Sequence, residues 1–132
     1  MKKFVRNSDV LIIDDEKDVR DLLLNVFEDE GAQVKLAENG HEGFQMLMNS
    51  HFDIVLLDLF MPEMDGFQAI KAIRQVDPII PIIVITGYAT QENITKCFDL
   101  GASDYFSKPF DIKQITKRAD ELIQEKQDSD GV

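Results

Sequence analysis

Apolar residues follow two different periods along the chain. Five short segments are predicted to be strands, and they cover residues 9–14, 32–37, 52–58, 81–86 and 104–108. The first of them is a continuous apolar run rich in branched residues, as expected of a buried strand. After each predicted strand, apolar residues recur every three or four positions, as they do on one face of a helix. These helical segments cover residues 16–31, 40–50, 65–76, 90–101 and 111–126. The pattern therefore predicts five strands that alternate with five helices.

The strand patterns indicate a parallel sheet with helices on both faces. Residues 9–14 and 52–58 are nearly continuous apolar runs, which is typical of strands buried on both sides. The run at 32–37 instead alternates between apolar residues such as Val34 and polar residues such as Lys35, as in an edge strand. With right-handed crossovers, these features favour an α/β, flavodoxin-like (βα)5 three-layer sandwich with a five-stranded parallel sheet in the order 2-1-3-4-5.

The length of the chain, 132 residues, suits a single domain. The helical pattern ends near residue 126, so residues 1–126 are expected to form the domain. Residues 127–132 are expected to be a frayed tail or the start of a linker. The helices are expected to bury apolar stripes formed by Val19, Leu22, Leu23, Val26, Phe27, Phe44, Leu47, Met48, Phe67, Ile70, Ile73, Ile112, Ile115, Ala119 and Leu122.

Polar residues end four of the five predicted strands. They are Asp14 and Asp15 at the first strand, Asp58 at the third, Thr86 at the fourth and Lys108 at the fifth. The carboxyl ends of parallel strands share one edge of the sheet, where ligands bind. Three carboxylates gathered there repel one another, and Mg²⁺, which prefers oxygen ligands, would relieve the repulsion. Such a set suits phosphoryl transfer, which depends on positioning and charge stabilisation.

These motifs, in this order, resemble the receiver domains of two-component response regulators. The resemblance covers about residues 8–126, and it joins Asp14-Asp15, Asp58 with Met61-Pro62 and Asp65-Gly66, Thr86-Gly87, and Lys108-Pro109. It implies a Mg²⁺-dependent reaction in which Asp58 takes a phosphoryl group from the phosphohistidine of a histidine kinase or a histidine phosphotransfer domain. The domain would then act on an output partner or output domain that the sequence does not name.

The resemblance also implies which groups bind the metal ion. Asp15 would bind Mg²⁺ directly, and Asp14 would bind it mainly through water. Asp58 and the backbone carbonyl of Phe60 would complete the protein ligands. On its own, Asp14-Asp15 before a helix would be read as a helix cap, but Asp58 and Lys108 favour a metal site.

Further roles are implied for the phosphoryl contacts and for the switch. Thr86 and Lys108 would contact phosphoryl oxygens, and Lys108-Pro109 would be a cis peptide. Tyr105 would change rotamer when Thr86 moves inward. The surface formed by the fourth helix, fifth strand and fifth helix would then change, and a homodimer could form through it.

Two other kinds of protein fit parts of the pattern. A Mg²⁺-dependent phosphatase that forms an aspartyl phosphate usually has a second Asp two residues after its nucleophile, where this chain has Phe60. A pseudo-receiver that serves only as a binding module would normally have lost a key residue, and none is lost here. The receiver interpretation also puts Phe60 and Tyr88 beside the phosphoryl group, where two bulky rings leave less room for an attacking water.

Charge and the remaining residues narrow the partners and the location. A net charge of −11 disfavours direct binding to nucleic acid or to an anionic membrane. No run approaches the ~20 apolar residues of a membrane span, and the start has no signal-peptide pattern. The single cysteine, Cys97, is expected in the core, and His41 and His51 are expected at the surface. A reducing, cytoplasmic location is the resulting expectation.

Overall fold

The computed structural model describes residues 5–61 and 64–130. The strands are β1 (Asp9–Ile13), β2 (Gln33–Ala37), β3 (Ile54–Leu57), β4 (Ile82–Thr86) and β5 (Asp104–Ser107). The helices are α1 (Lys17–Asp29), α2 (Gly40–Asn49), α3 (Gly66–Val76), α4 (Gln91–Leu100) and α5 (Ile112–Asp130). Every predicted element is present, and its ends lie close to the predicted ones except at the end of α5.

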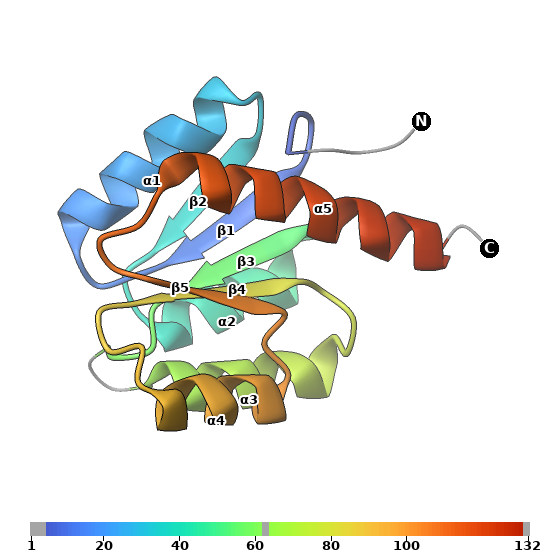
Figure 1. The fold of residues 1–132 in the computed structure, drawn as a ribbon. Helices are drawn as coiled ribbons and strands as arrows, with labels where there is room; N and C mark the ends of the chain where they lie inside the picture. Colours follow the sequence, from blue (N-terminus) through green and yellow to red (C-terminus); the bar gives the residue numbers. More distant parts are fainter. Residues whose placement is uncertain (1–4, 62–63, 131–132) are drawn as a thin grey trace.

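The strands form one parallel sheet in the order β2-β1-β3-β4-β5, as predicted. Helices α1 and α5 cover one face of this sheet, and α2, α3 and α4 cover the other (Figure 1). The predicted flavodoxin-like, three-layer α/β fold is therefore confirmed.

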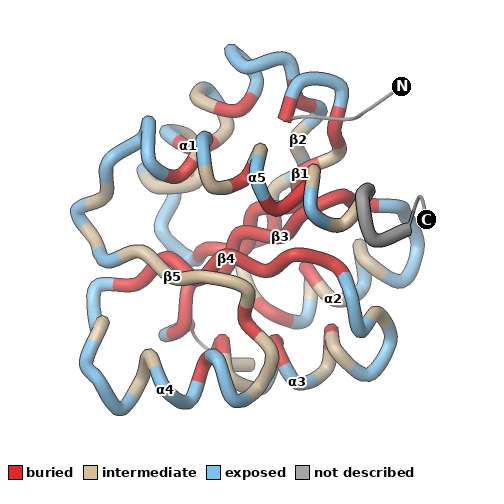
Figure 2. The backbone as a smooth tube through the Cα atoms, turned by 45° about the vertical axis from the view of Figure 1, so that its right-hand side comes forward, coloured by how far each residue is buried: buried red, intermediate tan, exposed pale blue. Residues whose placement is uncertain are grey.

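The sheet separates two apolar cores, one on each face. In β1, Leu11 and Ile13 pack in the core under α2, α3 and α4, whereas Val10 and Ile12 pack in the core under α1 and α5. Successive side chains of a strand point to opposite faces, so a strand covered on both sides must be apolar at every position. Strands β3 and β4 are buried along their whole length, which explains their continuous apolar runs (Figure 2).

Strand β2 lies at one edge of the sheet, as its alternating pattern predicts. Gln33 and Lys35 are exposed, and burial increases only toward Ala37 at the end of the strand. Exposed polar side chains on an edge strand hinder pairing with strands of other molecules.

Three residues that the helical pattern assigns to the core are exposed instead. The exposed fractions of Leu22, Met48 and Ile112 are 43%, 57% and 38%. Successive helix residues point about 100° apart, and the neighbours Leu23 and Leu47 take the inward positions in α1 and α2. Ile112 begins α5, whose apolar stripe reaches the sheet only from the second turn. The prediction was wrong at these margins.

Helix α5 continues to Asp130, past the predicted end of the helical pattern at residue 126. The assignment of residues 127–132 to a frayed tail or the start of a linker stays a prediction. No glycine or proline lies between Ile112 and Asp130, and nothing in the backbone stops the helix before Gly131. The last turns of α5 project beyond the sheet (Figure 1). The extent of the domain, residues 1–126, stays a prediction.

Candidate functional site

The sheet itself holds the predicted site residues at the carboxyl ends of its strands. The backbone N–H groups of Asp14 and Asp58 donate to main-chain carbonyls of neighbouring strands at 3.1 and 3.0 Å. The N–H of Lys108 donates to the carbonyl of Thr86 at 2.8 Å. These bonds continue the strand pairing past β1, β3 and β5, so the residues that follow these strands are fixed relative to one another.

The ammonium group of Lys108 brings three carboxylates together. Its Nζ atom lies 3.1 Å from Oδ2 of Asp14 and 3.4 Å from Oδ2 of Asp58. A third carboxylate, Oε1 of Glu16, lies at 2.9 Å. Sequence reasoning missed Glu16, although it directly follows Asp14-Asp15 and the helical pattern begins there. The structure thus confirms that Asp14, Asp58 and Lys108 meet, and it adds Glu16.

Burial is the largest cause of the raised pKa values of the two buried carboxyl groups, Asp14 and Asp58. Burial raises the pKa of Asp58 to about 6, and the nearby charge of Asp14 adds to the increase. Lys108 and the backbone N–H of Phe60 oppose this shift. Burial also raises the pKa of Asp14, against a hydrogen bond from the Glu16 N–H and the charge of Lys108.

The charge of Lys108 is stabilised by the same groups. Burial alone would lower its pKa, but Glu16, Asp14 and Asp58 together raise it above the usual value. At neutral pH the site therefore contains a charged lysine beside an ionised Asp58, with a surplus of negative charge.

Four carboxylates at this edge can converge on one cation. Asp14, Asp15, Glu16 and Asp58 each offer an oxygen atom, and these oxygens lie within 4.8 Å of one another. Asp14 and Asp58 are buried, whereas Asp15 and Glu16 are exposed. A set of oxygen ligands with surplus negative charge suits a hard dication such as Mg²⁺. The residues present therefore fit a metal ion, and the Phe60 carbonyl stays a predicted ligand.

A cavity of about 540 Å³ opens at this edge of the sheet. Its lining residues are Asp15, Glu16, Asp58, Phe60, Gly87, Tyr88 and Lys108. The rings of Phe60 and Tyr88 meet edge to face with centroids 4.9 Å apart. The ring of Phe60 also meets that of Phe67 edge to face, with centroids 6.1 Å apart. The aromatic pair links the loops that follow β3 and β4, so it bounds the space in front of Asp58.

Thr86 ends β4 but does not line this cavity. Its side chain is buried, and its Oγ1 accepts a hydrogen bond of 3.1 Å from the N–H of Tyr88. The hydroxyl hydrogen is left to donate elsewhere. The structure brings Thr86 to the predicted edge, whereas its role toward a phosphoryl group stays a prediction.

The start of α3 supports the segment that carries Asp58. Asp65 caps the helix by accepting a hydrogen bond from the Gln68 N–H, and the Gln68 side chain accepts one from the Asp65 N–H. The next residue, Gly66, lies so close to β3 that an added Cβ would come within 2.6 Å of the Asp58 carbonyl oxygen. Pro62 of the Met61-Pro62 motif lies outside the described residues.

The family described as "Response regulator receiver domain" matches residues 10–120 of the chain. This chain belongs to that family. Sporulation initiation phosphotransferase F of Bacillus subtilis is 38% identical over 109 residues, which cover 83% of this chain and 88% of that protein. Regulatory protein AtoC of Escherichia coli is 39% identical over 106 residues, which cover 80% of this chain but only 23% of AtoC. Against several curated relatives, the chain spans between 23% and 50% of their length.

Solved receiver structures share this fold. A CheY-like response regulator receiver domain protein from Methanospirillum hungatei aligns with a TM-score of 0.90 at 28% identity, covering 93% of this chain and 98% of that one. The receiver domain of the Francisella response regulator 1452 aligns with a TM-score of 0.85 at 28% identity, covering 90% and 98%. The phosphatase and pseudo-receiver alternatives are not favoured.

The remaining predicted features of this receiver domain can be located. Lys108-Pro109 is a cis peptide, as predicted. Tyr105 is half-buried on β5, and its ring meets the ring of Phe98 on α4 with centroids 6.0 Å apart. Cys97 is buried, and burial raises its pKa to about 11, so the prediction of a core residue is confirmed. The switching role of Tyr105 stays a prediction.

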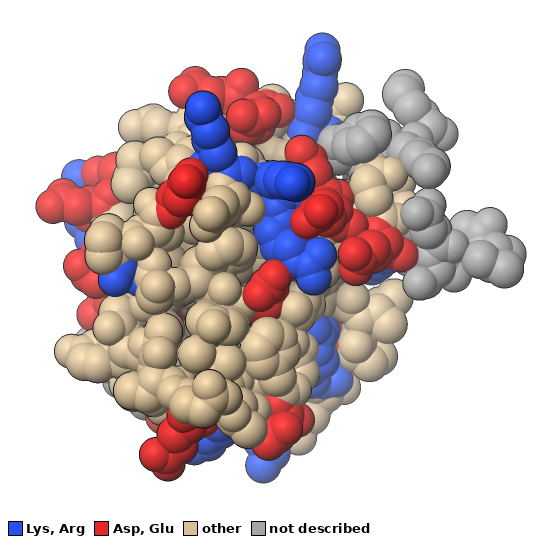
Figure 3. Space-filling model, in the orientation of Figure 1, with Lys and Arg blue, Asp and Glu red and all other residues tan. Residues whose placement is uncertain are grey.

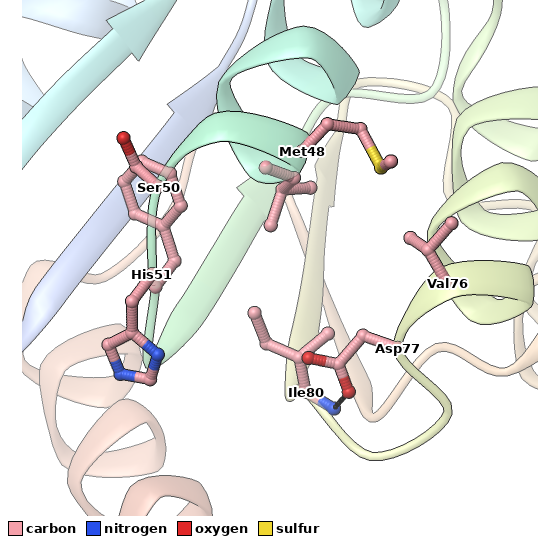
Figure 4. A pocket seen from close by; sticks show the side chains of 8 residues that line it. Met48, Ser50, His51, Val76, Asp77 and Ile80 are labelled. Atoms are coloured by element: carbon pink, nitrogen blue, oxygen red, sulfur yellow. Dashed lines mark hydrogen bonds between the residues drawn. The ribbon is translucent and has the colours of Figure 1, made fainter.

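A second cavity of the receiver domain, of about 270 Å³, lies near the amino ends of β3 and β4, opposite the carboxyl ends that carry the candidate site (Figure 4). It forms where α2 and α3 end and where β3 and β4 begin. Met48 and Val76 are among its lining residues, and an oxygen of Asp77 accepts a 3.0 Å hydrogen bond from the Ile80 N–H. None of the predicted phosphoryl or metal residues lines this cavity.

Both histidines are exposed, as predicted. Nε2 of His51 lies 3.1 Å from Oδ1 of Asp53. The other oxygen of Asp53 accepts a hydrogen bond of 2.8 Å from the Asp9 N–H. Asp53 thus ties the start of β1 to the segment before β3, which is a structural role.

One face of the receiver domain carries both basic and acidic side chains (Figure 3). On the face that carries α5, basic and acidic side chains are interspersed (Figure 3). Arg118 on this face pairs with Asp104 at 2.7 Å and lies 3.6 Å from Glu121. In the described part of the chain, no helix has the length and apolar character needed to cross a bilayer.

Proposed function

We propose that Asp58 accepts a phosphoryl group from the phosphohistidine of a histidine kinase or a histidine phosphotransfer domain. The position of Asp58 carries this proposal. It is buried, its backbone is held at the end of a central strand, and its carboxylate lies 3.4 Å from the Lys108 ammonium. A phosphoryl acceptor needs a fixed nucleophile beside groups that neutralise charge.

The transfer forms one bond and breaks another. A carboxylate oxygen of Asp58 attacks phosphorus, the P–N bond of the phosphohistidine breaks, and the imidazole nitrogen keeps the electron pair. Because its pKa is about 6, Asp58 is ionised at neutral pH and can act as the nucleophile. Lys108 meets the negative charge on the phosphoryl oxygens, and the Thr86 hydroxyl donates a hydrogen bond to one of them.

Mg²⁺ is the cofactor in this proposal. Asp15 and Asp58 would hold it directly, Asp14 would hold it mainly through water, and the Phe60 carbonyl would be a further ligand. When bound, the ion neutralises charge on the carboxylates and on the phosphoryl oxygens. The convergence of carboxylate oxygens within 4.8 Å supports this assignment.

The same groups serve a second step, in which water attacks phosphorus, the bond between phosphorus and the Asp58 oxygen breaks, and inorganic phosphate leaves the regenerated carboxylate. In this proposal the domain catalyses its own phosphorylation and dephosphorylation, and it is a phosphoacceptor signalling domain rather than an enzyme with a separate substrate. The domain comprises residues 1–126. Its one cysteine is a buried free thiol, which fits a reducing, cytoplasmic location.

Phosphorylation then acts on a partner surface. Thr86 moves toward the phosphoryl group, Tyr105 turns into the space that it leaves, and the surface of α4, β5 and α5 changes. An output partner or domain binds this surface, or a homodimer forms through it. Tyr105 is half-buried against α4, which supports a rotamer change that alters both the interior beside Thr86 and the outer surface of α4 and β5.

Intact mass after incubation with a small phosphodonor and Mg²⁺ tests the acceptor. The wild-type domain should gain the mass of one phosphoryl group, whereas Asp58→Asn should gain none and stay folded. Asp21→Asn, which removes an exposed carboxylate on α1, should behave as wild type. Excess chelator should prevent the gain. A mass gain that persists in Asp58→Asn would refute the assignment.

A further inference from the structure

Glu16 makes the shortest of the three ion-pair contacts of Lys108. The distance from Nζ is 2.9 Å to Glu16, against 3.1 Å to Asp14 and 3.4 Å to Asp58. Glu16 is the N-cap residue of α1, yet its side chain makes no capping hydrogen bond. It reaches the ammonium group instead, so Lys108 is anchored toward α1 and lies farthest from Asp58.

The three partners differ in how easily they can release the lysine. The side chain of Glu16 is 59% exposed, whereas those of Asp14 and Asp58 are 3% and 7% exposed. Water replaces an ammonium group at an exposed carboxylate at small cost. A buried carboxylate that loses its partner is left uncompensated, which is costly. Glu16 is therefore the partner that Lys108 can leave.

Phosphorylation would change the balance between these partners. It replaces the single charge of the Asp58 carboxylate by a phosphoryl group with a charge of about −2 and strong acceptor oxygens. That charge attracts the ammonium of Lys108 away from α1. We propose that Glu16 is a positioning residue, which holds Lys108 toward α1 before phosphorylation and competes with the phosphoryl group for its ammonium. This inference rests on the proposed role of Asp58 as acceptor.

This competition lowers the stability of the phosphorylated form relative to the unphosphorylated form. The free energy of the Glu16–Lys108 contact must be given up when Lys108 moves to the phosphoryl oxygens. Removing the contact should therefore favour the phosphorylated form and its analogues. An ion pair with one exposed partner contributes little, so the expected change in affinity is about two- to five-fold.

Three variants separate the contact from the charge. Glu16→Gln keeps the size of the side chain and removes its charge. Glu16→Asp keeps the charge and withdraws it by one methylene from Lys108. Asp21→Asn is the matched control, because it neutralises another carboxylate of α1 that pairs with Lys17 and not with Lys108.

The first measurement uses the metal-free protein. The ¹H–¹³C NMR signals of the Lys108 ε-methylene, assigned with Lys108→Arg, report the surroundings of the ammonium group. They should move in Glu16→Gln and in Glu16→Asp, and stay in place in Asp21→Asn. Unmoved signals in both Glu16 variants would mean that the contact does not hold Lys108, and the inference would fail.

The second measurement is the affinity for beryllofluoride at saturating Mg²⁺, followed by amide NMR. Both Glu16 variants should bind it about two- to five-fold more tightly than wild type, and Asp21→Asn should match wild type. Equal or weaker binding by the Glu16 variants, or the same gain in Asp21→Asn, would overturn the inference. If wild type itself does not bind beryllofluoride, the proposed acceptor site fails, and the inference with it.

Discussion

At the scale of single residues, the space in front of Asp58 is bounded by a pair of aromatic rings. Phe60 and Tyr88 have exposed fractions of 42% and 64%, and their rings touch edge to face. They come from different loops, so their contact must open before that side of the cavity opens. Because hydrolysis of an aspartyl phosphate needs a water in line with the acyl oxygen, we expect this contact to prolong the life of a phosphoryl group on Asp58.

Replacing either ring should shorten the life of the phosphorylated domain. An aromatic pair is worth about 0.5–1.5 kcal/mol, so Phe60→Ala or Tyr88→Ala should speed hydrolysis about 2- to 10-fold. The decay of phosphorylated mass after removal of the phosphodonor measures this rate. Leu22→Ala is the control, because Leu22 is similarly exposed at 43% and does not line the cavity. Unchanged decay in both ring variants would show that water enters by another side.

At the scale of elements, the N-terminus of α3 is pressed against the end of β3. The N–H of Gly66 donates to the carbonyl of Leu59 at 2.6 Å. A Cβ at this position would lie 2.5 Å from Cα of Leu59, a backbone atom that cannot move aside without shifting the segment. Glycine is therefore required here by a close approach, and that approach keeps the Asp58 segment in place.

Gly66→Ala should lower the free energy of unfolding by about 1–3 kcal/mol, as expected for overpacking. Denaturant unfolding followed by circular dichroism measures the change. Gly87→Ala is the matched control, since a methyl group there would meet no atom within 4 Å beyond its chain neighbours, and it should stay within about 0.5 kcal/mol of wild type. Equal stabilities for the two variants would mean that α3 can withdraw from β3 without cost.

At the scale of the whole molecule, the pairing of β4 with β5 connects the candidate site to the α4-β5-α5 surface. Thr86 pairs with Ser107, and Val84 pairs with Tyr105 two residues earlier. The backbone of Lys108 is bonded to that of Thr86. If Thr86 moves as proposed, we expect the movement to reach β5 through this adjacent backbone.

Binding of beryllofluoride with Mg²⁺ should therefore shift amide NMR signals far from Asp58. We expect the largest distant shifts between about residues 86 and 118, because these residues form the end of β4, α4, β5 and the start of α5. The Asp58→Asn protein under the same additions is the control and should show none of them. Shifts limited to the loops around Asp15 and Asp58 would mean that the domain carries phosphate without switching.

Much of this architecture could be predicted from the chain alone. The continuous runs of β3 and β4 and the alternation in β2 determine which strands are central and which is at the edge, because burial on one or two faces dictates the side-chain pattern. Once the order is set, Asp14, Asp58 and Lys108 must meet, since each directly follows the carboxyl end of a parallel strand. The pattern of apolar and polar residues along the chain is enough to predict the strand order and the meeting of these residues.

Tertiary structure alone decided the finer features. Helical periodicity cannot tell which residue at the margin of a stripe touches the sheet, so Leu22 and Met48 were misassigned. The reach of Glu16 to Lys108 depends on how α1 leaves β1, and the contact of Phe60 with Tyr88 depends on two loops that are distant in sequence. These contacts arise from packing between elements, and the period of a single segment contains no information about its neighbours.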